Sequence, residues 1–105
     1  MAQFSVHKNK DPKTRDAYPY LVDIQANLLR DLQTRVVVPL IKQAAMGKKS
    51  IDTLTPSVEV DGQKFLMLVP QLAGIPVGSL GPEVASLVSH REKVVASIDF
   101  LVTGI

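Results

Sequence analysis

The first part of the chain alternates apolar and polar residues with a period of two, which is typical of strands with one buried face. This alternation runs through residues 3–7 and returns in residues 20–25, where Asp23 lies on the more polar face. Residues 35–41 are rich in β-branched side chains and predict another strand. Pro39 within it predicts an edge or a bulge, because proline lacks a backbone N–H.

Residues 57–69 form the clearest local pattern in the chain. Two apolar runs flank Asp61-Gly62, and this dipeptide favours a type I′ hairpin turn because both central residues need positive φ. Residues 75–77 indicate a further short strand, while residues 42–50 fit either a helical turn or a loop. The middle of the chain is therefore predicted to be β-rich.

Beyond residue 80 the apolar spacing changes to three and four residues. Gly81-Pro82-Glu83 resembles a helix start, with proline at the first helical position and an acid in the first turn. Gly104 suits the position just after a helix end. We therefore expect a C-terminal helix over about residues 82–103. Its expected buried stripe consists of Val84, Leu87, Val88, Arg91, Val94, Val95, Ile98, Leu101 and Val102.

Phe100 falls outside that stripe and is expected to face outward beside an apolar chain end. An exposed aromatic residue next to apolar residues can mark a contact surface. Packing against a second subunit, or fraying of the last turn, would explain the same pattern. The residues alone leave these readings open.

Length and composition indicate one globular domain spanning residues 1–105 and define several exclusions. The chain is 46% apolar and 21% charged, as expected for a folded protein. Its net charge of +2 is too small, and its basic residues too scattered, to indicate direct specific DNA binding. It contains no cysteine, which excludes disulfides and thiolate chemistry. The sequence also lacks a signal-peptide pattern or membrane-length apolar run, so a cytoplasmic protein is expected.

The residues that could carry chemistry are few and scattered. Only two histidines occur, and there is no glycine-rich phosphate loop, so we expect no catalytic residues, no metal and no cofactor. Metal-free RNA cleavage needs only a base, an acid and a cation. The residues that could supply these groups in some fold are His7, Arg15, Asp23, Arg35 and His90, but their spacing does not show that they converge.

Six collinear segments resemble the CcdB family of toxins, over essentially the whole chain. Ser89-His90-Arg91-Glu92 is the same tetrapeptide as in that family, and Pro39 and the chain end also match in position. The segments are 1–4, 20–29, 35–40, 75–77 with 83–85, 89–92 and 98–105.

This resemblance implies both a fold and a mode of action. The family fold is a homodimer of small SH3-like barrels, which agrees with a mainly β reading of about five antiparallel strands and a C-terminal helix. CcdB-like proteins are not enzymes: they bind the dimerisation region of the DNA gyrase A subunit and trap gyrase on cut DNA. A CcdA-like antitoxin neutralises them through a disordered segment that folds on binding.

The resemblance also implies a gyrase-binding site at the helix end and a nearby loop. The implied site residues are Leu28, Leu29, Asp99, Phe100, Thr103, Gly104 and Ile105. Thr103 stands where the family has a tryptophan that stacks on a gyrase arginine, and threonine cannot make a cation–π contact. The hypothesis for this chain is that Phe100 supplies part of the missing apolar contact.

Two other functions remain open at this stage. Ribonuclease toxins share the CcdB-type fold, so an mRNA interferase is the main alternative. A chromosomal relative that has lost toxicity is the other, and Thr103 is its only hint.

Overall fold

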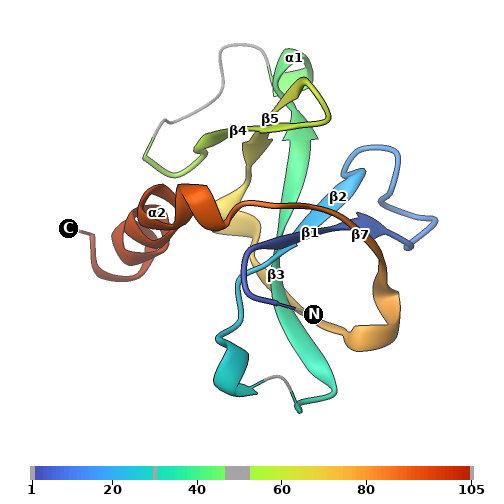
Figure 1. Ribbon diagram of the computed structural model, residues 1–105. Coiled ribbons are helices and arrows are strands. Elements are labelled where there is room, and N and C mark those ends of the chain that lie inside the picture. The colour runs from blue at the N-terminus through green and yellow to red at the C-terminus, as the bar shows by residue number, and fades with distance from the viewer. Residues whose placement is uncertain (1, 30, 47–52, 105) are drawn as a thin grey trace.

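Seven antiparallel strands form one strongly curved sheet in the computed structural model, which describes residues 2–29, 31–46 and 53–104 (Figure 1). The strands are β1 (Ser5–Asn9), β2 (Tyr20–Asp23), β3 (Thr34–Lys42), β4 (Ser57–Val60), β5 (Gln63–Met67), β6 (Ala73–Pro76) and β7 (Leu80–Ser86). The helices are α1 (Gln43–Met46) and α2 (Arg91–Thr103), with short 3-10 turns η1 (Asn27–Leu29), η2 (Val69–Gln71), η3 (Val77–Ser79) and η4 (Val88–His90). The mainly β fold with a C-terminal helix is confirmed, with more strands than the five expected.

Strand β3 pairs with three other strands. The sheet order is β4-β5-β3-β2-β1-β7, and β6 also pairs with β3. On the side away from β2, β3 pairs with β6 through Thr34–Val37 and with β5 through Leu40–Lys42. Pro39 lies between these two stretches. Its carbonyl accepts a hydrogen bond from Leu68 N at 3.0 Å, so its nitrogen faces the same side. Pro39 therefore lies between the stretch of β3 that pairs with β6 and the stretch that pairs with β5.

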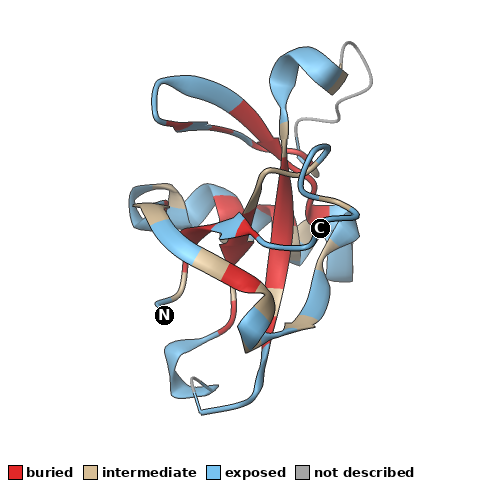
Figure 2. Cartoon of the chain, turned by 90° about the vertical axis from the view of Figure 1, so that its right-hand side faces the viewer, coloured by how far each residue is buried: buried red, intermediate tan, exposed pale blue. Residues whose placement is uncertain are grey.

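One face of the sheet and α2 enclose the main hydrophobic core, shown by the red segments in Figure 2. Tyr20 and Phe65 meet edge to face there, with ring centroids 5.3 Å apart. The buried apolar members are Phe4, Val6, Val22, Val38, Leu40, Val58, Val60, Phe65, Met67, Val69, Leu87 and Val94. The alternation in residues 3–7 and 20–25 put Phe4, Val6, Tyr20, Val22 and Ile24 on the apolar faces; Phe4, Val6 and Val22 are buried, and Tyr20 and Ile24 pack against the core partly buried.

The other face of the central strands is also buried, which the alternation did not predict. A smaller cluster of Leu21, Val37 and Leu80 lies there. Asp23 and Arg35 on β2 and β3 are 0% exposed. The sheet therefore buries charged groups as well as its apolar face.

The β4–β5 hairpin has the geometry that Asp61-Gly62 predicted. Asp61 has φ of 52° and Gly62 has φ of 78°, as a type I′ turn requires. The strand predicted at residues 3–7, in contrast, begins only at Ser5. Phe4 precedes it with φ of 70°, a conformation that breaks an extended strand.

The predicted start of the C-terminal helix was wrong. Leu80–Ser86 forms strand β7, which pairs with β1, and α2 begins only at Arg91. The β1–β7 register shifts between the pairs His7↔Glu83 and Asn9↔Leu80, and Pro82 falls at that irregularity. Pairing with a strand more than 70 residues away overrode the local helix-start pattern.

The predicted buried stripe of the helix was also partly wrong. Val94 and Ser97 are the buried residues of α2, while Leu101 is 36% and Val102 74% exposed. Phe100, expected to face outward, is half-buried. The first turns of α2 pack on the core, whereas its last turn lies at the outer end of the helix (Figure 1).

The close approach of β7 to β1 gives a first testable prediction. A Cβ atom at Gly81 would lie 2.8 Å from the Lys8 carbonyl oxygen, so β1 and β7 would have to separate. We expect Gly81→Ala to lower the free energy of unfolding by about 1–3 kcal/mol, the usual cost of overpacking. Urea denaturation measures this. Gly74→Ala on β6, where a Cβ meets nothing within 4 Å, is the control; equal effects of the two changes would refute the explanation.

Candidate recognition surface

The end of α2 is closed by local hydrogen bonds that fix the last described turn. Thr103 Oγ1 donates to the Asp99 carbonyl at 2.7 Å, and Gly104 N donates to the Phe100 carbonyl at 2.9 Å. Gly104 has φ of 74°, the left-handed conformation of a helix cap. The predicted cap is confirmed. Ile105 lies outside the described residues.

This turn is apolar as well as exposed. Leu101 and Val102 are solvent-accessible, and Asp99, Thr103 and Gly104 are exposed beside them. Four of the predicted site residues, Asp99, Phe100, Thr103 and Gly104, therefore lie together at the C-terminal end of α2 and its cap. The fold gathers them by sequence proximity alone.

The other predicted residues, Leu28 and Leu29, lie on η1. Leu28 is 94% exposed, Leu29 is 49% exposed, and Leu32 in the following turn is 50% exposed. Large apolar side chains so accessible on a short turn are typical of a contact surface. Sequence reasoning missed Leu32, although its spacing of three and four residues from its two neighbours was a usable signal.

A buried polar network lies directly behind η1. Asp23 Oδ2 accepts a hydrogen bond from Arg35 Nε at 2.9 Å, and it forms an ion pair with Arg35 Nη2 at 2.6 Å. Asp23 Oδ1 accepts from Gln25 N at 3.0 Å. The Gln25 side chain continues the network, because Nε2 donates to the Leu29 carbonyl at 2.8 Å and Oε1 accepts from Val36 N at 3.1 Å.

The two groups of predicted residues do not meet within one chain. The η1 turn lies at the lower end of the sheet and the last turn of α2 lies beside its middle, and Figures 1 and 2 agree on this separation. A partner contacting both groups must therefore span part of the surface, or reach one group on each of two protomers.

Three of the five residues considered for RNA cleavage are buried, and the five do not form one accessible group. Asp23 and Arg35 are fully buried against each other, and His7 is 4% exposed with Nδ1 donating to the Gly81 carbonyl at 2.9 Å. Arg15 is exposed on the loop after β1, and His90 is half-buried on η4. Asp23 and Arg35 therefore form an ion pair inside the fold.

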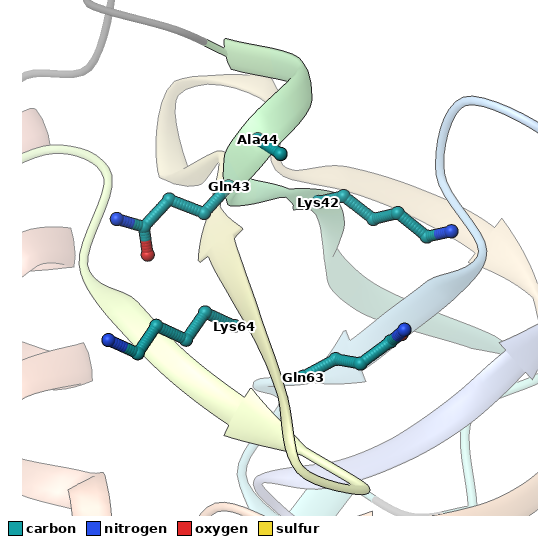
Figure 3. A pocket seen from close by; sticks show the side chains of 5 residues that line it. All are labelled: Lys42, Gln43, Ala44, Gln63 and Lys64. Carbon is teal, nitrogen blue, oxygen red and sulfur yellow. The ribbon is translucent and has the colours of Figure 1, made fainter.

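A surface hollow of about 570 Å³ is lined by Lys42, Gln43, Ala44, Gln63 and Lys64, at the upper end of the sheet in Figure 1. Figure 3 shows Lys42 and Gln63 pointing to one side of β5, and Gln43 and Lys64 to the other. A small-molecule site needs polar groups that converge. This hollow lacks that arrangement.

Residues 2–29, 31–46 and 53–104 contain no cluster of three or more histidine, aspartate and glutamate side chains placed to hold a metal ion. Within the same ranges, no helix has both the length and the apolar character needed to cross a membrane.

Comparison with known families gives one finding over nearly the whole chain. The family model described as CcdB protein matches residues 3–104. The match covers β1 to the end of α2, and so includes η1, the buried network and the last helical turn.

Proposed function

This chain belongs to the CcdB family, and from that premise we propose that it is the toxin of a type II toxin–antitoxin module. It binds the dimerisation region of the DNA gyrase A subunit and traps gyrase on cleaved DNA. It acts in the cytoplasm by binding, without catalysing a reaction and without a cofactor. A cognate CcdA-like antitoxin is its second partner.

The observation that supports this proposal is the exposure of apolar residues on η1 and in the last turn of α2, where we propose the gyrase contact. Leu28 is almost fully solvent-exposed, and Val102 is 74% exposed next to the helix cap. Each of these side chains leaves apolar area in water, and burying it against a partner protein would be favourable in free energy. Recognition of another protein is the function they fit.

We further propose that the protein works as a homodimer. The exposed apolar residues of the last α2 turn and of η1 lie apart in one protomer. A two-fold assembly can present both groups to a two-fold symmetric gyrase subunit pair. Sedimentation equilibrium measures the assembly directly, and a monomer at micromolar concentration would contradict it.

The proposal is tested by binding. The purified chain is titrated with a gyrase A fragment that contains the dimerisation region, and saturable binding is expected. Incubation of the same protein with purified RNA tests the mRNA interferase alternative. Cleavage of RNA without gyrase binding would contradict our proposal and support an mRNA interferase. If the protein neither binds gyrase nor cleaves RNA, the result would favour a relative that has lost toxicity.

Phe100 supplies the next prediction. Because Thr103 cannot stack on an arginine, we expect Phe100→Ala to weaken binding to the gyrase A fragment by about tenfold, the scale of an aromatic interface residue. Since Phe100 is half-buried, urea denaturation is run in parallel. The matched control is Tyr18→Ala, another half-buried aromatic residue, on the loop after β1. Unchanged affinity with Phe100→Ala would refute the role.

A further inference from the structure

We propose that Gln25 is a positioning residue that holds the exposed leucines of η1 in their binding geometry. This inference rests on the proposed function, and it assigns a role to a side chain that does not itself reach a partner. Gln25 is only 7% exposed. It therefore acts through the Leu29 carbonyl, with which it shares a hydrogen bond.

The Gln25 amide bridges two segments that are separate in the sequence. Its Nε2 donates to the Leu29 carbonyl at 2.8 Å, and its Oε1 accepts from Val36 N at 3.1 Å on β3. Both ends of the side-chain amide are thus used, one by the turn and one by the central strand. The turn is therefore tied to β3, which pairs with β2, β5 and β6.

The backbone of Gln25 is itself held by the buried ion pair. Its backbone N–H donates to Asp23 Oδ1, and Asp23 is paired with Arg35, both fully buried. Asp23 and Arg35 lie on β2 and β3, so the network starts in the rigid sheet. The ion pair therefore holds Gln25 in place, and Gln25 in turn holds the Leu29 carbonyl.

The N-terminal end of η1 has its own attachment. Gln3 N donates to Asn27 Oδ1 at 2.8 Å, and Gln3 Nε2 donates to the Ile24 carbonyl at 3.2 Å. Unlike Gln25, Gln3 is partly accessible to solvent. The Gln3–Asn27 hydrogen bond is exposed, whereas the two hydrogen bonds of the Gln25 amide are part-buried. Water competes less with the part-buried bonds, so the Gln25 attachment contributes more to the order of the turn.

Such order matters because η1 has no buried residues of its own. A turn that lacks core contacts must be immobilised when a partner binds, and this costs affinity. A turn already fixed by the hydrogen bonds of Gln25 avoids part of that cost. Exposed leucines held by a polar network behind them are therefore suited to fast, specific docking.

The test is a double-mutant cycle in gyrase A fragment binding. Gln25→Met keeps the side-chain volume and removes both amide hydrogen bonds. It is measured in the parent chain and in the variant carrying Leu28→Ala and Leu29→Ala. Gln63→Met, at an exposed glutamine on β5, is the matched control.

We expect Gln25→Met to weaken binding about fivefold in the parent chain, the scale of one net hydrogen bond. In the double-alanine background the same change should weaken binding less than about twofold, because coupled residues are not additive. Equal losses in both backgrounds would overturn the proposal, since a purely structural role predicts additivity.

Amide hydrogen exchange tests the same role without gyrase. The Leu29 and Leu32 amides donate to the Ala26 and Leu29 carbonyls, so their exchange reports the order of the turn. Gln25→Met should accelerate them about tenfold and leave Val38 in β3 unchanged, as expected for local opening. The proposal would be refuted if the exchange rates of the Leu29 and Leu32 amides stay unchanged, or if the Val38 amide is accelerated equally. If the parent does not bind gyrase, the proposed function fails, and exchange still decides the role of Gln25.

Discussion

Deletion of Thr103, Gly104 and Ile105 is expected to abolish gyrase-linked DNA breaks while the protein stays folded. The deletion removes the helix cap and the last residue of the chain, where we propose the main contact. Loss of such hot-spot residues should weaken gyrase binding by more than about 30-fold. Cleaved DNA on a gel, in the presence of purified gyrase and ATP, measures the effect.

Folding should survive because the deletion spares the core. The hydrogen bonds lost are Thr103 Oγ1 to the Asp99 carbonyl and Gly104 N to the Phe100 carbonyl, both local to the last turn. Val94 and Ser97 keep α2 on the core. We expect a loss of about 1 kcal/mol in unfolding free energy. Lys13→Ala, in the exposed loop after β1, is the control for trapping. Undiminished DNA breaks after the deletion would contradict this account of the site.

Asp23→Ala is expected to be the most destabilising single substitution in the chain. It leaves the fully buried Arg35 without its carboxylate partner and removes the acceptor of Gln25 N. Breaking a buried ion pair by removing one partner costs about 3–5 kcal/mol. That is a large share of the roughly 5–15 kcal/mol by which small domains are stable. Urea and thermal denaturation measure the loss.

Two comparisons isolate the ion pair as the cause. Asp16→Ala changes an exposed acid on the loop after β1 and should have little effect on stability. The double replacement of Asp23 by Leu and Arg35 by Met should recover part of the stability, because apolar residues of similar volume can replace a buried pair. A loss below about 1 kcal/mol for Asp23→Ala would show that the pair is dispensable.

Elements with strong local signals could be predicted from the sequence. The Asp61-Gly62 turn was found because positive φ at two successive residues restricts the residue types. The alternation around Val22 identified β2, and Gly104 identified the helix end. Each of these features is set by residues close to one another in the chain.

Features set by distant residues could not be predicted in this way. Gly81-Pro82-Glu83 matches a helix start locally, and only pairing with β1 makes the segment a strand. Asp23 was placed on the more polar face of its strand, as charged residues usually are. Its burial depends on pairing with Arg35 from β3, which alternation does not encode.

The candidate site follows the same rule. The last helical turn is contiguous, so its residues were predictable as a group, although the exposure of Phe100 was overestimated. The η1 leucines were implied by family resemblance, but their support by Gln25 depends on hydrogen bonds across the fold. Leu32 was missed because a single exposed leucine in a polar segment is common on protein surfaces.

The most direct test of the central claim is a DNA cleavage assay with purified gyrase, ATP and the full-length protein. Our account predicts protein-linked double-strand breaks that increase with the amount of this chain and disappear when excess gyrase A fragment is added as competitor. Absence of gyrase-linked breaks at saturating protein, with the chain shown to be folded, would contradict it.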